Sequence, residues 1–173
     1  AVLLDSISKR YSVCGARIGC LITHNKKILD TSLRLGQARL CPPTLEQIGA
    51  KAAVHTPASY FTEVINEYKQ RRNVVFEELK KIPGVFALKP QGAFYTIVKL
   101  PVDDADKFST WLLKEFHLQN ETIMLAPANG FYATPAKGVD EVRIAFVLNA
   151  ESMKRSMEIL REALKVYPGR VKH

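Results

Sequence analysis

The segment from residue 6 to residue 19 constrains the fold most, because it places a short turn between two strand-like stretches. An apolar run, Ala1 to Leu4, precedes the segment and predicts the end of a buried strand. Residues 15–23 alternate weakly and predict a second strand that leaves the turn. Within the turn, two serines, a lysine and an arginine converge, which suits a phosphate group held beside a reactive amine.

Lys9 is the candidate reactive group of this turn. A lysine at the end of a buried strand loses hydration, which makes its amine a usable nucleophile. The guanidinium fork of Arg17 matches a phosphate bidentately, and the hydroxyls of Ser6 and Ser8 can donate to the same group. The alternatives are a surface lysine in an ordinary turn and serines that only cap it.

The same segment resembles the lysine signature of class I aminotransferases, the aspartate aminotransferase-like branch of the fold-type I pyridoxal phosphate enzymes. The defined positions of that pattern are filled by Ser6, Ser8, Lys9, Ser12, Val13, Gly15, Arg17, Ile18 and Gly19. A match of this length and order is far more specific than a lone glycine motif. Residues 141–146 also resemble that family's carboxylate-binding arginine segment, so the resemblance spans nearly the whole chain.

The resemblance implies pyridoxal 5'-phosphate as cofactor and assigns roles to six residues. Lys9 would hold the cofactor aldehyde and then move a proton at the substrate's α-carbon. Ser6, Ser8 and Arg17 would bind the cofactor phosphate.

Two further arginines would bind substrate. Arg143 would bind the α-carboxylate of the amino acid, unless it is an exposed strand residue paired with Glu141 or Asp140. Arg39 lies in a region that approaches the neighbouring subunit's active site in the family, so it could bind a distal carboxylate. A solvated arginine that complements a helix dipole is its alternative.

The resemblance also implies an α/β fold, namely the C-terminal portion of a fold-type I transferase. Residues 1–56 would be a remnant of the large pyridoxal phosphate-binding domain that carries the lysine motif. Residues 57–173 would form a long bridging helix and a small C-terminal α+β domain, with helices covering one face of its sheet. In the family the lysine lies past the middle of the chain, so we expect a C-terminal part that is inactive alone.

Periodicity and turn residues predict the elements in more detail. Thr44 is expected to cap a helix with Gln47 three residues later. The tail, residues 168–173, is polar and expected to fray. Helices are predicted over residues 26–40, 59–82, 104–116 and 152–167, and a further helix is predicted to begin at residue 44. Strands are predicted over residues 94–100, 122–126 and 141–148.

Composition excludes several other classes. The formal charge of +8 could serve nucleic acid, but no basic cluster is interleaved with aromatic residues, so we expect no nucleic-acid partner. No apolar run approaches the roughly 18 residues of a membrane span. The four histidines are scattered, and Cys14, Cys20 and Cys41 lack metal-ligand spacing, which predicts no metal and a reduced, cytoplasmic protein.

These observations predict part of an aminotransferase that moves an amino group from an amino acid to a 2-oxo acid. Aspartate is one candidate donor, and the resemblance implies a homodimer for the full-length protein. A pyridoxal phosphate-dependent carbon–sulfur lyase shares the lysine motif and remains an alternative. A regulatory or binding domain that keeps the aminotransferase-like fold without catalysis is another.

Overall fold

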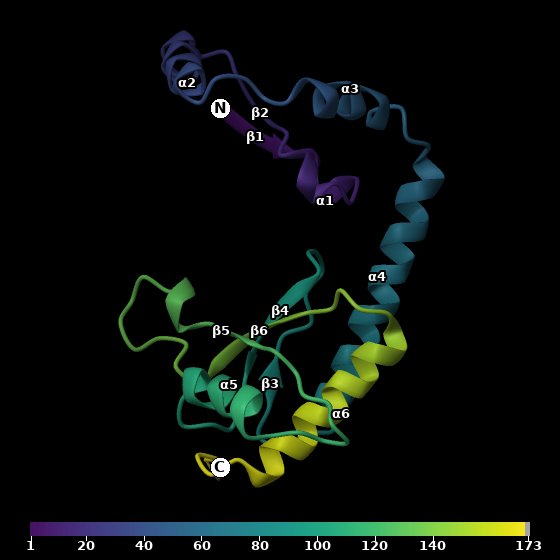
Figure 1. Cartoon of the computed structure of the whole chain (residues 1–173), viewed down its shortest axis with the longest axis vertical. Helices are drawn as coiled ribbons and strands as arrows, with labels where there is room; N and C mark the ends of the chain where they lie inside the picture. The colour runs from purple at the N-terminus through teal and green to yellow at the C-terminus, as the bar shows by residue number, and fades with distance from the viewer. Residues whose placement is uncertain (172–173) are drawn as a thin grey trace. The chain divides into compact units, whose positions relative to one another are not determined.

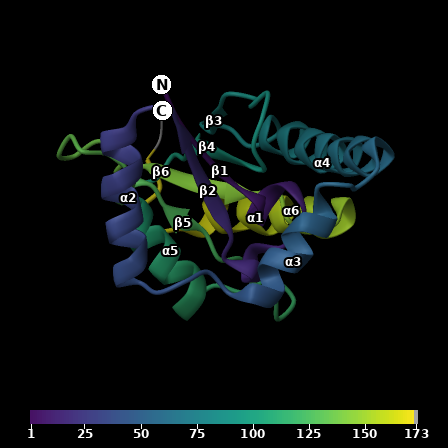
Figure 2. The same ribbon diagram turned by 90° about the horizontal axis from the view of Figure 1, so that it is seen from above.

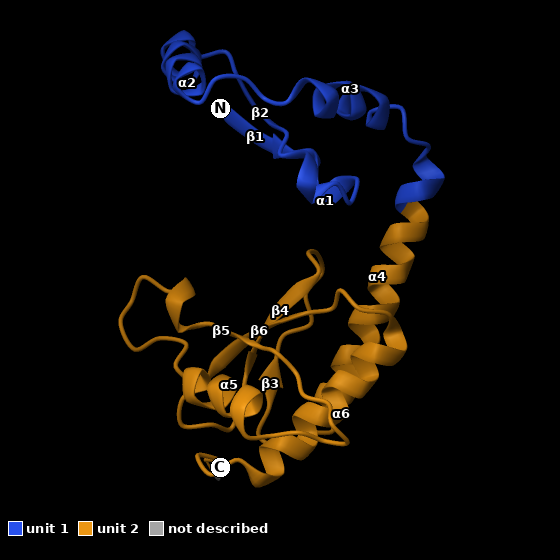
Figure 3. Ribbon diagram, in the orientation of Figure 1, with its two compact units in different colours: residues 1–61 blue, residues 62–173 orange. Residues whose placement is uncertain are grey.

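The computed structural model describes residues 1–171 of the chain, which form helices and two antiparallel sheets. The chain divides into two compact units, residues 1–61 and residues 62–173 (Figure 3). The boundary falls inside one long helix, α4 (Ala58–Leu79). Each unit is described by itself below.

The first unit begins with a pair of antiparallel strands around the lysine-bearing turn (Figure 1). β1 (Val2–Ser6) pairs with β2 (Gly19–Thr23), from Val2 opposite Thr23 to Ser6 opposite Gly19. Between the strands lie a single helical turn, α1 (Ile7–Arg10), and a 3-10 turn, η1 (Cys14–Ala16). The predicted strand therefore starts at Gly19 rather than at residue 15, because the η1 turn occupies the intervening residues.

Two helices complete this unit. α2 (Lys26–Ala38) is capped by Asn25, whose side chain accepts a hydrogen bond from the Ile28 amide, and it confirms the helix predicted there. α3 (Thr44–Ala53) also begins where predicted, but the predicted cap is wrong. Thr44 is the first helical residue after Pro43, and Gln47 donates its side-chain amide to the Pro42 carbonyl at 2.9 Å.

The first unit has no buried residue anywhere in residues 1–61, all of which the structure describes. Leu4 in β1 is 75% exposed, and Leu40 after α2 is 85% exposed. The prediction of a buried strand at the start of the chain is therefore half right: the strand forms, but nothing in this unit covers it. A two-stranded sheet without a packed layer is marginal in water, because it buries too little apolar surface.

The second unit is built on a four-stranded antiparallel sheet in the order β3–β4–β6–β5. Its strands are β3 (Phe86–Ala87), β4 (Tyr95–Lys99), β6 (Glu141–Ala145) and β5 (Ala126–Pro127). Side chains alternate between the two faces, as strand geometry requires. Val98, Val142 and Ile144 are buried on one face, whereas Tyr95 and Arg143 are exposed on the other.

Two helices, α5 (Ala105–Lys114) and α6 (Ala150–Val166), pack against the buried face of this sheet (Figure 1 and Figure 2). Asp104 caps α5 and Asn149 caps α6, each through a side-chain oxygen. The second half of α4 joins the same core. Its most buried members include Val75, Leu79, Phe108, Leu112, Phe146, Met157, Leu160 and Leu164.

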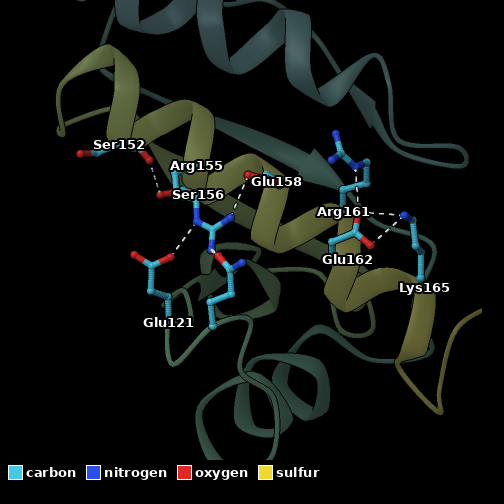
Figure 4. A network of polar contacts seen from close by, with 9 residues as sticks. Glu121, Ser152, Arg155, Ser156, Glu158, Arg161, Glu162 and Lys165 are labelled. Atoms are coloured by element: carbon cyan, nitrogen blue, oxygen red, sulfur yellow. Dashed lines mark hydrogen bonds and ion pairs between the residues drawn. The ribbon is translucent and has the colours of Figure 1, made fainter.

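The outer face of α6 carries a chain of ion pairs (Figure 4). Arg155 donates to Glu121 at 2.7 Å and to Glu158 at 2.9 Å, and Lys165 pairs with Glu162 at 2.7 Å. Exposed pairs of this kind contribute between about 0.2 and 1 kcal/mol each. Burial of the opposite face of the helix therefore contributes most to its docking.

Several boundaries in the second unit differ from the sequence predictions. β5 covers only residues 126–127 rather than 122–126, and Thr122 bonds through its hydroxyl to the Leu112 carbonyl. β6 ends at Ala145 rather than at residue 148. The tail is not frayed up to Val171, because the Asp103 amide donates to Gly169 and the Val171 amide donates to Pro101. The last two residues of the predicted tail, 172 and 173, lie outside the described residues.

Within residues 1–171, none of the helices is both long enough and apolar enough to cross a membrane. The same stretch contains no group of three or more histidine, cysteine or acidic side chains arranged to bind a metal ion.

We expect the stability of the second unit to depend on Tyr167 at high pH. Tyr167 is 8% exposed, and its hydroxyl donates to Asp103 at 3.0 Å. Burial, then this hydrogen bond, raise the pKa of Tyr167 to about 12, whereas an unfolded tyrosine titrates near 10. The neutral phenol therefore stabilises the fold below pH ~10, and this contribution of up to about 3 kcal/mol is lost as pH rises to ~12.

Urea unfolding followed through the single tryptophan, Trp111, measures this effect, because Trp111 packs on Tyr167 with ring centroids 5.2 Å apart. Between pH ~9 and ~12, the free energy of unfolding should fall more steeply for the wild type than for Tyr167→Phe. Parallel curves for the two proteins would show that the Tyr167 phenol is not held neutral by the fold.

Candidate functional site

The two serines of the lysine turn, defined as residues 6–19, lie next to each other at the end of β1. Ser6 caps α1, and its Oγ accepts a hydrogen bond from the Ser8 amide at 3.2 Å. The hydroxyl oxygens of Ser6 and Ser8 are 3.0 Å apart, and Ser6 Oγ also lies 3.3 Å from the Ile18 carbonyl. The turn therefore presents two neighbouring hydroxyl groups, and the capping alternative for Ser6 is observed.

Lys9 and Arg17 are brought together through Cys14. Lys9 Nζ donates to Cys14 Sγ at 3.3 Å, and Arg17 Nη1 donates to the Cys14 carbonyl at 3.1 Å. The return of the chain uses positive φ angles at two residues that are not glycine, Ser12 (56°) and Arg17 (54°). Such conformations are uncommon outside glycine, and clusters of them are typical of functional turns.

Gly19 closes this turn, and its lack of a side chain matters. A Cβ atom there would lie 2.9 Å from the Asp5 carbonyl oxygen of the neighbouring strand. Cβ atoms in proteins essentially never come this close to another heavy atom. Glycine therefore allows β2 to begin directly opposite Ser6. This close pairing holds the start of the turn against its end.

Lys9 is exposed in this chain, so the prediction of a lysine dehydrated by a buried strand is wrong for the first unit taken alone. The reason is the same as for β1: no layer of the unit covers the strand. The adjacent Arg10 is engaged in an ion pair with Asp5 at 2.9 Å, and the Asp5 charge raises the pKa of the Arg10 guanidinium. Arg10 is therefore a structural partner of β1 despite its place beside Lys9.

Arg39 is not brought to the lysine turn by any hydrogen bond or ion pair within residues 1–171. It is an exposed residue at the C-terminal cap of α2, where its amide bonds to the Gln37 and Gly36 carbonyls. This position agrees with the helix-end alternative. A role for Arg39 toward a substrate carboxylate remains a prediction.

Arg143 lies in the second unit, on the exposed face of β6. Its guanidinium carbon is 5.4 Å from the ring centroid of Tyr95 and 5.0 Å from that of Phe131. Cation–π contacts use the flat face of the guanidinium. Its N–H groups lie in the plane of the fork and can donate elsewhere. Two aromatic rings therefore flank the Arg143 guanidinium on the exposed face of the sheet.

The carboxylates that could have neutralised Arg143 bind other groups in the described part of the chain. Asp140 pairs with Lys99 at 3.1 Å. Glu141 accepts a hydrogen bond from the Tyr132 hydroxyl, and this bond, with burial and the carboxylate charge, raises the pKa of Tyr132. The alternative pairing of Arg143 with Asp140 or Glu141 is therefore not found, and the arginine remains suited to an external carboxylate.

Sequence reasoning missed Cys14, and it did not pair Tyr95 or Phe131 with Arg143. Tyr95 could have been found from strand alternation once β4 was paired with β6, because Ile97 lies opposite Arg143 and Tyr95 shares its face. Phe131 belongs to a 3-10 turn, η2 (Asn129–Phe131), so strand alternation gives no signal for its contact with Arg143. Cys14 reaches Lys9 only because of η1, which no sequence pattern indicated.

Comparison with known proteins identifies the family of the chain. The family described as Aminotransferase class I and II matches residues 1–160. The aspartate aminotransferase of Thermotoga maritima is 30% identical over 163 residues, which cover 94% of this chain and 39% of that protein. A (5-formylfuran-3-yl)methyl phosphate transaminase of Methanocaldococcus jannaschii is also 30% identical, over 94% of this chain and 42% of that protein.

Solved structures show the same fold. The crystal structure of the Thermotoga maritima aspartate aminotransferase aligns with 95% of this chain and 40% of its own, with a TM-score of 0.78 and 30% identity. An alanine aminotransferase from Pyrococcus furiosus gives the same TM-score at 26% identity, over 95% of this chain and 42% of its own. The fold is that of the C-terminal part of the fold-type I aminotransferases, as the sequence predicted.

The chain belongs to the class I and II aminotransferase family, because the family match covers most of its length. It spans about two fifths of the length of the curated relatives that it matches.

We expect Ser6→Ala to loosen the lysine turn, because the Ser8 amide would lose its acceptor. Loss of a helix cap costs about 1 kcal/mol, so hydrogen exchange of the Ser8 amide should accelerate roughly fivefold. Ser8→Ala is the matched control, because it removes the neighbouring hydroxyl and leaves the cap in place. NMR-detected exchange compares the two variants, and equal exchange rates would contradict the capping role of Ser6.

Proposed function

We propose that the protein to which this chain belongs is a pyridoxal phosphate-dependent aminotransferase that transfers an amino group from an amino acid to a 2-oxo acid. The observation that carries the proposal is the lysine turn, where an amine, two hydroxyls and a guanidinium are gathered within one short segment. Family membership supports it, because the matched relatives named here are aminotransferases or transaminases.

The donor set of the turn fits the cofactor. A phosphate takes hydrogen bonds from hydroxyls and from a guanidinium fork, which Ser6, Ser8 and Arg17 supply. An aldehyde takes a primary amine, which Lys9 supplies. When bound, pyridoxal phosphate acts as an electron sink that stabilises negative charge at the α-carbon of an amino acid.

The residues of this chain then have distinct tasks. Lys9 would hold the cofactor and, once its amine is released by substrate, would move the proton at the substrate's α-carbon. Arg143, flanked by Tyr95 and Phe131, would bind the α-carboxylate and so fix the orientation of the α-carbon. Arg39 is proposed to bind a distal carboxylate if the substrate is dicarboxylic, as aspartate is.

We expect borohydride reduction of the full-length protein in the presence of pyridoxal phosphate to label Lys9, because reduction makes an amine–aldehyde linkage permanent. Peptide mass spectrometry locates the label. Lys9→Arg should lose the label and the activity, while Lys26→Arg, a change of the exposed first residue of α2, should keep both. A label confined to another lysine would contradict the role of Lys9.

The proposed role of Arg143 predicts a specific kinetic defect. Arg143→Gln removes charge-assisted hydrogen bonds worth about 1.5–3 kcal/mol, so kcat/KM for the amino acid should fall by roughly 10- to 100-fold. Arg143→Lys should fall less, since it keeps the charge but not the fork. Arg161→Gln is the control, because Arg161 pairs only with Glu162 on α6 among the described contacts. Unchanged kinetics in Arg143→Gln would contradict the proposal.

We also propose that residues 1–173 alone do not catalyse transamination. The first unit buries no side chain, and Lys9 is exposed, so a bound cofactor would meet little binding surface and much water. Mixing the purified chain with pyridoxal phosphate, an amino acid and 2-oxoglutarate should give no product above the protein-free reaction. Turnover that depends on Lys9 would overturn this expectation.

A homodimer and a cytoplasmic location complete the proposal. The apolar side chains left exposed on the first unit, such as Leu4 and Leu40, support an association that covers them. The three cysteines are all free in the structure, which fits a reducing compartment.

A further inference from the structure

The contact between Lys9 and Cys14 has no role in the proposed function, although two hydrogen bonds define the position of the sulfur. Cys14 Sγ lies 3.3 Å from Lys9 Nζ, and its thiol also donates to the Ser8 carbonyl at 3.4 Å. These two contacts hold the sulfur directly against the amine. Both residues are exposed in this chain, so a small oxidant in solvent can reach the sulfur there.

The backbone fixes this pairing. The Val13 amide donates to the Ser8 carbonyl at 3.0 Å, and the η1 turn then places Cys14 over α1. Cysteines that react with oxidants lie in partly exposed, electropositive surroundings. Here the positive charge comes from the Lys9 side chain beside the Cys14 sulfur. The pair therefore places an exposed sulfur and a lysine nitrogen at contact distance.

The other two cysteines lack this arrangement. Cys20 lies in β2 opposite Asp5, and Cys41 lies between α2 and α3. Both are exposed, as Cys14 is. Neither has a lysine amine among its hydrogen-bond partners in the part of the chain that the structure describes. They provide matched controls for exposure and for the chemistry of a free thiol.

We propose that Lys9 and Cys14 form an oxidation-dependent covalent bridge, which makes the lysine turn a redox-sensitive modification site. Hydrogen peroxide first oxidises the Cys14 thiol to a sulfenic acid, and the peroxide is reduced to water. The Lys9 ammonium gives up a proton to solvent, and the resulting amine attacks the sulfur. An S–N bond forms, the S–O bond breaks, and the oxygen leaves as water with one proton from the amine.

The bridge has a direct consequence for the lysine. Its nitrogen is consumed, so Lys9 cannot also bind an aldehyde while the bridge is present. Thiols reverse the reaction, because attack at the sulfur breaks the S–N bond and restores the amine. The existence of the bridge follows from the contact geometry and does not depend on the proposed aminotransferase activity.

The test treats the intact protein, freed of pyridoxal phosphate, with hydrogen peroxide and then analyses a protease digest by mass spectrometry. We expect a peptide in which Lys9 and Cys14 are joined, lighter than its parts by two hydrogen atoms. Cys14→Ser and Lys9→Arg should each lose this peptide, while Cys20→Ser and Cys41→Ser should keep it. Dithiothreitol should return Lys9 and Cys14 to their original masses.

Two results would overturn the proposal. One is oxidation of Cys14 to its acids with the Lys9 amine unchanged. The other is an equal yield of lysine cross-links at Cys20 or Cys41, which would show that contact geometry has no part in the reaction.

A parallel sample with pyridoxal phosphate bound separates this proposal from the proposed function. If Lys9 holds the cofactor, the bound sample should form no bridge. A bridge that forms equally with and without the cofactor would count against the role of Lys9 in the proposed function. It would leave the Lys9–Cys14 chemistry supported.

Discussion

The pairing of β1 with β2 is the constraint on which the candidate site depends. It sets Ser6 opposite Gly19, so the residues between them must turn back within a short loop. The close approach at Gly19 and the left-handed conformations of Ser12 and Arg17 make this return possible. As a result, the Arg17 guanidinium and the Lys9 amine both contact Cys14 although they are eight residues apart in the sequence.

The interactions that stabilise the first unit differ from those that stabilise the second. The second unit has a continuous apolar core between one face of its sheet and the helices α4, α5 and α6, and this core is what fixes β6 and therefore Arg143. The first unit has hydrogen bonds and caps but no buried side chain. Hydrophobic burial is the dominant favourable term in folding, so the first unit depends on surface that it does not itself contain.

Much of the fold could be predicted from the sequence, because periodicity reports burial within a helix or strand. α2, α4, α5, α6 and β4 begin and end within about three residues of their predicted bounds, and β6 begins at its predicted residue. The predictions failed where long-range contacts decide the structure. The tail is ordered to Val171 by backbone bonds to Pro101 and Asp103, and neither bond has a signature in the tail's own polar sequence.

The candidate site shows the same division. Ser6, Ser8, Lys9 and Arg17 are predicted from their order in one motif, and Arg143 from the resemblance of residues 141–146 to a carboxylate-binding segment. The exposure of Lys9 could not be predicted. An apolar strand indicates that another layer packs on the strand, but it does not show which part of the protein supplies that layer. The aromatic contacts of Arg143 depend on strand register and on the η2 turn, and the Cys14 contact depends on the η1 turn.

A crystal structure of the full-length protein with pyridoxal phosphate tests the central claim most directly. The account predicts electron density continuous from Lys9 Nζ to the cofactor, with the phosphate within hydrogen-bond distance of Ser6, Ser8 and Arg17. A cofactor bound at another lysine, or a phosphate held by residues outside the lysine turn, would contradict it.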